Sequence, residues 1–478
     1  MSARTAPPPW TGSAISPGAT AAWASAASPT WASPRGRAAI GTAGAKIDAG
    51  LIVTSQSRVK KLLVDANGAI NLELIATWVF LVFHMLAGKG RMKFLSKFWA
   101  ALLKKPLTKA YRHTPIRGMD HLMLGRPMEL WQRGIDIVDN FDDPYWDDKD
   151  VLHDFSEPAP PLQLVAGWYD FFKECQLEDF KKAGPRARLL ILPTWHWGIW
   201  KSWPLIMNVH VWTFQEHLQA RRPSNTVFPS SRVWAAALGD GDLDNWFLPF
   251  DDWPPPCVVT SYYLHDSELR TTGGGAWKRS YRSDPADPTP SIGGPSFSMV
   301  NAGPADQARV EKRQDVLVFT SPPLTEQLLI AGRVTLELSV EVGSASADFV
   351  GRLCDVMPDG KSVNRCEGLT RVAGPGRRAV AVDLGSTCCR FRPGHRLRLH
   401  VCSAAFPRLM RNLQTGEPLA DATRMEAAWH TVGEGSVLRL PAIPRPPPRV
   451  NLLPGERWEW ASRPETHVRS VGGEMARL

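Results

Sequence analysis

Residues 162–198 read LQLVAGWYDFFKECQLEDFKKAGPRARLLILPTWHWG. Two short apolar runs, 162–166 and 189–192, are typical of buried strands, and each ends at a turn residue. The segment between them, 171–182, has the pattern of a helix and closes at Gly184-Pro185. A strand–helix–strand unit of this length predicts that the two strands pair in parallel within an α/β domain.

Two side chains that can carry chemistry follow these strands. The first strand runs into Gly167-Trp168-Tyr169-Asp170, and the second runs into Pro193-Thr194-Trp195-His196. Ligands of open α/β sheets bind beyond the carboxyl ends of the strands, so we expect Asp170 and His196 to lie within hydrogen-bonding reach of each other. An aspartate that fixes the tautomer of a histidine is the orienting half of a nucleophilic triad, although a purely structural pair has the same residues.

A nucleophile for such a triad would precede the aspartate and the histidine, because the hydrolase order is serine, aspartate, histidine. Upstream, Ala14-Ile15-Ser16-Pro17-Gly18 matches a G-x-S-x-G elbow with alanine in place of the first glycine, and the alanine-rich stretch 21–27 that follows predicts a helix. We therefore take Ser16 as the candidate nucleophile. A flexible terminus rich in serine and glycine would give the same short pattern.

Beyond residue 230 the sequence predicts an all-β region. Short strand candidates alternate there with turn signals such as Pro358-Asp359-Gly360, and this spacing is typical of a sandwich or jelly roll. The strand candidates are residues 233–238, 257–264, 316–320, 332–342, 349–357, 379–384 and 397–403. The 41 prolines among 478 residues agree with a β-structure rich in loops, since proline breaks helix interiors.

These motifs resemble the CocE/NonD acyl hydrolase family, the cocaine esterase and Xaa-Pro dipeptidyl-peptidase type. The resemblance spans residues from about 10 to 443: Gly167–Asp170 is similar to the block that supplies the family's catalytic aspartate, and Pro193–His196 to the block that supplies its histidine. Further blocks resemble the family's C-terminal jelly-roll domain. They are residues 253–255, 263–264, 284–294, 313–317, 352–356, 358–360, 394–399, and 406–408 with 411–412.

The resemblance implies an α/β-hydrolase with a helical cap, followed by a jelly-roll β-sandwich, and a triad of Ser16, Asp170 and His196. It divides the chain into five parts: 1–70, a partial α/β-hydrolase with the elbow; 71–155, the helical cap; 156–225, the hydrolase remainder; 230–443, the jelly roll; and 444–478, a tail. Trp168, Trp195 and Trp197 would line the acyl pocket. The expected substrate is an acyl ester or an Xaa-Pro dipeptidyl peptide bond.

Two departures from the family concern the elbow. Only fifteen residues precede Ser16, so the strands that come before the elbow in the family are missing from this sequence. The residue after the serine, which normally gives its backbone N–H to the oxyanion, is Pro17, which has none. An alternative interpretation is therefore a catalytically impaired remnant, or a truncated gene model, in which the jelly roll serves as a binding or assembly module.

Composition excludes other classes of function. The net charge of +9 is spread along the chain without a run of five basic residues, so we expect no nucleic-acid partner. The longest apolar run, 74–87, is shorter than a membrane span, so we expect no membrane partner. Seven cysteines without C-x-x-C spacing, and no secretory signal, indicate the cytoplasm. We expect no cofactor. The sequence does not decide whether the chain forms a homo-oligomer.

A third hypothesis, hydrolysis that depends on a metal, rests on an acidic stretch. Its candidate ligands are Asp139, Asp142, Asp143, Asp147, Asp148, Asp150 and His153. The stretch lacks the spacing of an EF-hand loop, which needs glycine at its sixth position and glutamate at its twelfth. We interpret it as a structural or solvated loop and expect no metal site.

Overall fold

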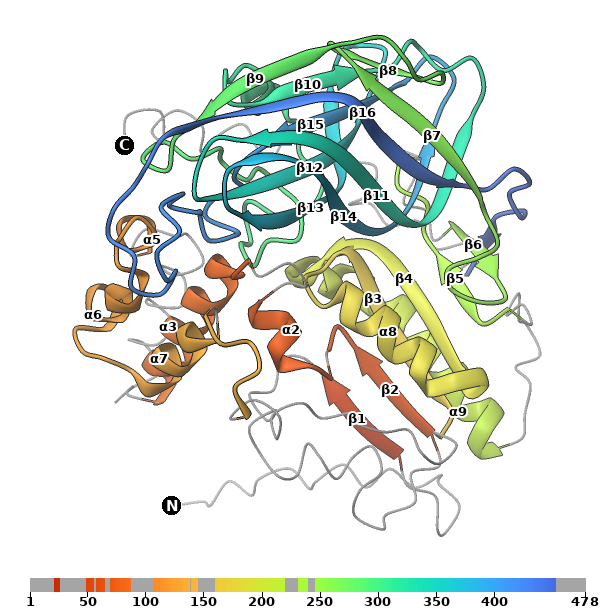
Figure 1. Cartoon of the computed structure of the whole chain (residues 1–478). Helices are drawn as coiled ribbons and strands as arrows, with labels where there is room; N and C mark the ends of the chain where they lie inside the picture. Colours follow the sequence, from red (N-terminus) through yellow and green to blue (C-terminus); the bar gives the residue numbers. More distant parts are fainter. Residues whose placement is uncertain are drawn as a thin grey trace, which may run out of the picture.

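The computed structural model describes residues 21–25, 49–55, 57–64, 69–86, 107–137, 139–144, 160–219, 231–239 and 246–452. Two sheets dominate these residues, with a group of helices beside them (Figure 1). The first half of the chain supplies most of one sheet and the helices, and the second half supplies the other sheet. The fold class, α/β plus all-β, agrees with the sequence prediction.

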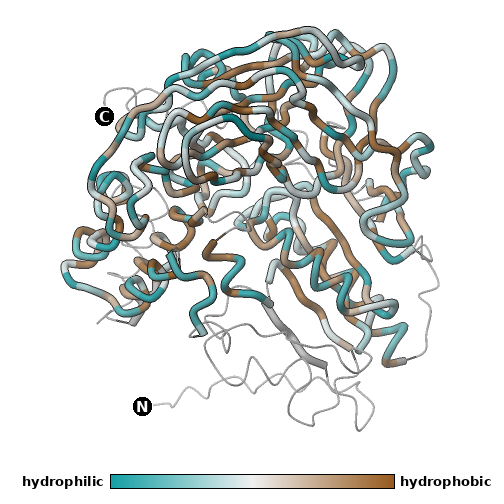
Figure 2. The backbone as a smooth tube through the Cα atoms, viewed as in Figure 1, coloured by the Kyte–Doolittle hydropathy of each residue, from teal (hydrophilic) through white to brown (hydrophobic). Residues whose placement is uncertain are grey.

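The first sheet has seven strands in the order β1-β2-β3-β4-β5-β6-β17, and β1 to β5 run parallel. Its strands are β1 (Ala21–Ser25), β2 (Ala49–Val53), β3 (Leu162–Tyr169), β4 (Ala187–Trp195), β5 (Val233–Ala235), β6 (Trp246–Phe250) and β17 (Val450–Asn451). All eight residues of β3 are buried, which is why its sequence is a continuous apolar run. Figure 2 shows this hydrophobic band through the lower sheet.

Helices connect the parallel strands. After β3 the chain enters α8 (Lys173–Ala183), and a 3₁₀ turn, η4 (Gly184–Arg186), leads into β4. After β4 it enters the 3₁₀ helix η5 (His196–Ser202) and then α9 (Trp203–Gln219). The predicted strand–helix–strand unit with parallel strands is therefore confirmed, with Leu162 level with Ala187.

One secondary-structure prediction is wrong. Residues 21–27 were expected to form a helix, yet Ala21–Ser25 is a strand whose residues pair in parallel with those of β2. Alanine favours a helix in an isolated chain, but propensity is a weak prior that tertiary context overrides. Pairing with the open edge of β2 satisfies backbone groups that a helix would leave unpaired on the sheet.

The helical part lies at one side of the first sheet (Figure 1). Its elements are α2 (Val59–Leu63), α3 (Leu72–Leu86), α5 (Thr108–Tyr111), the 3₁₀ helix η2 (Ile116–Gly118), α6 (Met119–Leu124) and α7 (Glu129–Asp136). They share one apolar core that also contains Phe297 and Phe406 of the β-region. Among the described residues, no helix is long and apolar enough to cross a membrane.

The second sheet has ten strands and curls until its first and last strands meet. The order is β13-β12-β15-β10-β8-β7-β16-β11-β14, with β9 added beside β16, and β13 lies against β14. The strands are β7 (Val258–His265), β8 (Glu268–Arg270), β9 (Lys278–Ser283), β10 (Leu317–Thr320), β11 (Leu328–Val342), β12 (Ser346–Val356), β13 (Ser362–Ala373), β14 (Gly376–Phe391), β15 (Arg396–Cys402) and β16 (Ala428–Ala442). The short helix α10 (Ala308–Glu311) precedes β10.

The structure shifts the expected limits of the jelly roll. β5 and β6 lie between residues 230 and 250 but belong to the first sheet, and β17, within the expected tail, pairs with β6. Residues 233–238 were assigned to the β-region because a three-residue apolar strand looks the same in either sheet. Its partner identifies it: Val233 is level with Leu189 of β4.

Candidate active site

Asp170 and His196 meet where β3 and β4 end. Tyr169 is level with Trp195 in the parallel register, so the next residue of each strand emerges at the same edge of the sheet. Nδ1 of His196 lies 3.1 Å from Oδ2 of Asp170. The Asp170 side chain is fully buried, whereas 12% of the His196 side chain is exposed. The structure therefore brings together two of the three predicted site residues.

The carboxylate of Asp170 is held in place on both sides. Its Oδ1 accepts a hydrogen bond of 2.9 Å from the backbone N–H of Phe172, and its own N–H donates to the carbonyl of Gly167. Oδ2 is left to accept the proton on Nδ1 of His196, and this selects the tautomer with a free Nε2. Nε2 has no hydrogen-bond partner among the described residues. The imidazole is thus arranged to take a proton from another group.

Gly167 allows β3 to approach β4 closely just before the aspartate. A Cβ atom at this position would lie 2.6 Å from the backbone oxygen of Thr194, a distance that real side chains do not adopt. The register between the two strands shifts between Gly167 and Tyr169. Glycine here therefore lets the end of β3 bend so that Asp170 faces His196.

Four aromatic rings surround the imidazole of His196. Its ring centroid is 4.6 Å from that of Phe171, 5.4 Å from Phe172, 5.4 Å from Trp197 and 5.8 Å from Phe297. Sequence analysis did not single out the three phenylalanines. The two that follow Asp170 could have been noticed by position, but Phe297 lies about a hundred residues further along the chain and carries no local signal.

The three predicted tryptophans have different positions, and Trp195 is partly buried against the core of the two sheets. Trp197 contacts His196, and its indole N–H donates to the carbonyl of Phe297 at 2.8 Å. Trp168 is buried in the core instead, where it packs on Trp253 and donates to the carbonyl of Ala236. The expectation that Trp168 lines a pocket is therefore wrong: side chains alternate along a strand, and the Trp168 side faces the packed interior.

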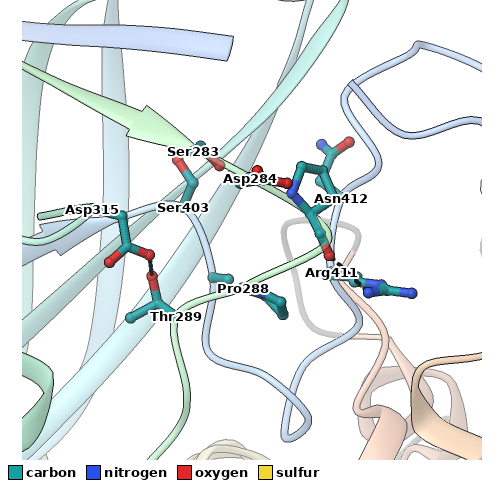
Figure 3. A pocket seen from close by; sticks show the side chains of 10 residues that line it. Ser283, Asp284, Pro288, Thr289, Asp315, Ser403, Arg411 and Asn412 are labelled. Atoms are coloured by element: carbon teal, nitrogen blue, oxygen red, sulfur yellow. Dashed lines mark hydrogen bonds between the residues drawn. The ribbon is translucent and has the colours of Figure 1, made fainter. Parts of the chain in front are cut away.

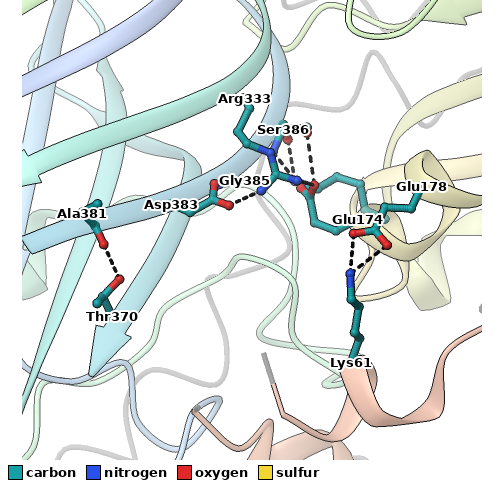
Figure 4. A network of polar contacts seen from close by, with 10 residues as sticks. Lys61, Glu174, Glu178, Arg333, Thr370, Ala381, Asp383, Gly385 and Ser386 are labelled. Carbon is teal, nitrogen blue, oxygen red and sulfur yellow. Dashed lines mark hydrogen bonds and ion pairs between the residues drawn. The ribbon is translucent and has the colours of Figure 1, made fainter. Parts of the chain in front are cut away.

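Hydrogen bonds and ion pairs connect α8, the helix that follows Asp170, to the β-region (Figure 4). Glu174, in the first turn of α8, accepts hydrogen bonds from the backbone N–H and the hydroxyl of Ser386, at 2.7 and 3.1 Å, and one from Arg333 at 3.1 Å. Arg333 also pairs with Asp383. Lys61 of α2 pairs with Glu178 one turn later. These contacts fix the start of α8, and with it the residues next to Asp170.

The remaining predicted residues are not part of this arrangement. Ser16 lies outside the described residues, as do Asp147, Asp148, Asp150 and His153. Asp139 accepts hydrogen bonds from the backbone of Leu419 and Ala420, a structural contact. Within the described ranges, no group of three or more histidine, cysteine, aspartate or glutamate residues is placed to hold a metal ion.

A pocket in the β-region is separate from the dyad (Figure 3). Its lining includes Asp284, Thr289, Asp315 and Arg411, and neither Asp170 nor His196. The polar groups in it satisfy one another: Thr289 donates to Asp315 at 2.7 Å, and Arg411 donates to the carbonyls of Pro285 and Arg112. We therefore assign it a structural role and place the candidate active site at Asp170 and His196.

Comparisons with known proteins show which families and folds the chain is similar to. Residues 226–436 match the X-Pro dipeptidyl-peptidase C-terminal non-catalytic domain. The chain is 31% identical over 326 residues to the cocaine esterase of Rhodococcus sp. (strain MB1 Bresler), a match that covers 59% of this chain and 56% of the esterase. The chain thus spans little more than half the length of this relative.

Two solved structures have the same fold. An aminopeptidase from the marine sediment archaeon Thaumarchaeota archaeon superimposes with a TM-score of 0.65 at 20% identity, over 83% of this chain and 72% of that one. A CocE/NonD family hydrolase from Staphylococcus aureus superimposes with a TM-score of 0.55 at 14% identity, over 83% and 68%. These likenesses show that the chain has this fold, and the sequence match shows that it is similar to cocaine esterase over 59% of its length.

Proposed function

We propose that this chain is a serine hydrolase of acyl esters in which Asp170 orients His196. The observation that carries the proposal is the hydrogen bond of 3.1 Å between the buried Asp170 carboxylate and Nδ1 of His196. This contact holds the imidazole with Nε2 available as a base, at the edge of the sheet where parallel strands deliver functional groups. The 31% sequence identity to cocaine esterase over 326 residues supports ester hydrolysis as the reaction.

In the proposed reaction a serine hydroxyl attacks the ester carbonyl while Nε2 of His196 takes its proton. The imidazolium then gives this proton to the departing alcohol, and an acyl-serine remains. Water attacks the acyl group in the second step, again losing a proton to Nε2, and the imidazolium returns this proton to the serine oxygen as the acid is released. Asp170 stabilises the imidazolium in both steps and keeps its own charge.

The strand register bears on which serine attacks. Ser16 is the candidate from the sequence pattern, but it precedes β1. Ala21 is level with Ala49, whose neighbour Gly50 is level with Leu162, so Ala21 lies about nine residues, or ~30 Å, below the level of Asp170. The five residues from Ser16 to Ala21 span at most about 17 Å, which is less than the distance from Ala21 to the level of Asp170. The register therefore favours a serine at or after the carboxyl end of β1 over Ser16, and Ser25 and Ser28 are the first two.

The surroundings of His196 favour an ester over an Xaa-Pro peptide as the substrate. A dipeptidyl-peptidase has to recognise a free, positively charged amino terminus, which requires an acidic group close to the scissile bond. The described side chains that ring His196 are aromatic. Such a surface suits an apolar acyl group.

The experiment is a colorimetric assay with 4-nitrophenyl esters on the wild-type protein and on Ser16→Ala, Ser25→Ala and Ser28→Ala. One of these changes should abolish turnover, and the other two should leave it unchanged. Loss in Ser25→Ala or Ser28→Ala agrees with the register of β1, whereas loss in Ser16→Ala agrees with the elbow pattern. Equal turnover by all four proteins would reject these three serines as the nucleophile. No turnover by any of them would reject the proposal and support a binding or assembly role.

A further inference from the structure

A cluster of buried charged side chains lies where β12, β13 and β15 run side by side in the β-region. His400, Arg352 and Glu367 are level with one another on these strands, so their side chains project from the same face. Arg408, in the loop after β15, joins them. Only 1% of the Arg352 side chain, 4% of Glu367 and 9% of Arg408 is exposed. Two arginines and one glutamate are therefore held almost wholly out of contact with bulk water.

The charges of these three side chains do not balance. Nε of Arg352 donates to Oε2 of Glu367 at 2.7 Å, and Nη2 of Arg408 lies 3.0 Å from Oε1 of the same carboxylate. Burial raises the pKa of Glu367, but the two arginines outweigh burial and hold this pKa below its ordinary value, so the carboxylate is charged. Two guanidinium groups thus share one negative charge, and one positive charge is left over.

The neighbouring acidic group does not supply the missing charge. Glu311 of α10 pairs with Arg398 at 2.6 Å and accepts a hydrogen bond of 3.0 Å from Nε2 of His400. Burial lowers the pKa of His400, so its imidazole is neutral at neutral pH. In the described part of the chain, no carboxylate other than Glu367 pairs with Arg352 or Arg408.

Donor groups of both arginines also lack an acceptor. Nη1 and Nη2 of Arg352 and Nε of Arg408 are buried and have no hydrogen-bond partner among the described residues. Buried donors in folded proteins are nearly always paired, and an unpaired buried charge is strongly unfavourable. A water molecule would accept some of these N–H groups but would leave the positive charge uncompensated. An anion would satisfy both the donors and the charge.

We propose that this cluster is a binding site for a small monovalent anion such as chloride, held by Arg352 and Arg408. The single negative charge follows from the single uncompensated guanidinium group. The size is limited because neighbouring segments enclose the cluster. A Cβ atom at Gly294 would lie only 2.9 Å from Oε1 of Glu367, and the carbonyl of Arg408 accepts the N–H of Glu73 at the start of α3. The anion would therefore stabilise the β-region where it meets the helical part, independently of ester hydrolysis.

The experiment is thermal unfolding of the full chain in sodium chloride and in sodium gluconate at equal ionic strength. Gluconate has the same charge but is too bulky for an enclosed site. We expect the Tm in chloride to exceed the Tm in gluconate by about 3–5 °C and to rise with the chloride concentration. Arg352→Met should remove this difference, because it leaves Glu367 and Arg408 as a balanced pair.

Arg371→Met is the matched control, since Arg371 pairs with Asp348 on the same two strands, β13 and β12, and it should keep the chloride effect. Equal Tm values of the wild type in the two salts would overturn the inference, as would a chloride effect that persists in Arg352→Met.

A second measurement does not depend on the folding of a variant. The wild-type protein is crystallised in sodium bromide, because bromide scatters anomalously and water does not. We expect an anomalous peak in contact with the Nη atoms of Arg352. An anomalous map without a peak at this position would also overturn the inference.

Discussion

Two aspartate–histidine pairs in this molecule have nearly the same geometry. In the first sheet Nδ1 of His196 lies 3.1 Å from Asp170, and in the β-region Nδ1 of His395 lies 2.8 Å from Asp355. In both pairs the aspartate side chain is fully buried and 12% of the histidine side chain is exposed. Distance and burial alone therefore cannot identify a catalytic pair.

The two pairs differ in the partner of the aspartate oxygen that does not face the histidine. Asp355 also accepts a hydrogen bond of 2.8 Å from Arg365, a buried cation, so its charge is already compensated. Asp170 accepts a backbone N–H instead, and no cation other than a protonated His196 pairs with it in the described part of the chain. The charge of Asp170 is thus available to stabilise an imidazolium.

Replacing each histidine should give the largest difference in activity between the two pairs. His196→Asn removes the base, and we expect the rate of ester hydrolysis to fall by about 10⁵- to 10⁶-fold. His395→Asn is the matched control and should keep wild-type turnover. Steady-state kinetics on the two variants, with circular dichroism to verify the fold, checks this expectation; similar losses in both would contradict it.

The aspartates should give the same contrast with a smaller effect on rate. In Asp170→Asn the amide favours the wrong imidazole tautomer, and a loss of about 10⁴-fold in kcat is expected. Asp355→Asn should remain active, because its partner His395 is not at the site. The comparison fails if Asp355→Asn loses as much activity as Asp170→Asn.

The Asp355 pair should matter for stability. Asp355→Ala leaves Arg365 buried without a counter-charge, since only 5% of the Arg365 side chain is exposed, and should lower the free energy of unfolding by about 3–5 kcal/mol. The double variant Asp355→Ala/Arg365→Met removes the orphaned charge and should recover part of this loss. Urea unfolding of both proteins measures it. An equally unstable double variant would show that the charge is not the cause.

Asp179 shows what burial does to a carboxylate when desolvation outweighs the cations around it. It lies on α8, accepts a hydrogen bond from Ser57, and burial raises its pKa to about 6. An acid whose pKa is higher in the folded state binds a proton there more tightly, so its contribution to stability is present below pH 4 and is lost as the pH rises to about 6. Asp179→Asn should remove this loss, which is at most about 3 kcal/mol. Unfolding measured at pH 4.5 and 7 tests it, with the wild type as reference; identical pH slopes would contradict the expectation.

The smallest effect concerns the attachment of α8. Glu174→Gln weakens the hydrogen bonds to Ser386 and Arg333 and should cost about 1–2 kcal/mol, because the side chain is partly exposed. Glu178→Gln is the matched control: it breaks the pair with Lys61 and leaves the β-region contacts intact. Thermal unfolding compares them, and a larger loss in Glu178→Gln would argue against the role assigned to Glu174.

Sequence patterns predicted the part of the site that is encoded locally. Asp170 and His196 each follow a run of buried apolar residues, so parallel pairing was enough to bring them together. Phe297 could not be found this way, since its place depends on how the β-region packs against η5 and α3. The strand at Ala21–Ser25 was missed for a related reason, because only its partner β2 makes it a strand.

The β-region was predicted well where strands are long and bounded by turns, as at β11 and β12. Short strands were assigned less well: β5 has three residues, too few to show which sheet it joins. The sequence likewise carries no sign that Asp355 has Arg365 as a second partner. Which of two aspartate–histidine pairs has a free charge is decided by tertiary contacts.

The most direct measurement is covalent labelling with a fluorophosphonate, which reacts only with a serine that a base activates. Wild-type protein and His395→Asn should each take up one label per chain, and mass spectrometry should locate it on a single serine. His196→Asn should take up none. Labelling of His196→Asn at the wild-type rate, or no labelling of the wild type, would contradict the assignment of Asp170 and His196 as the catalytic pair.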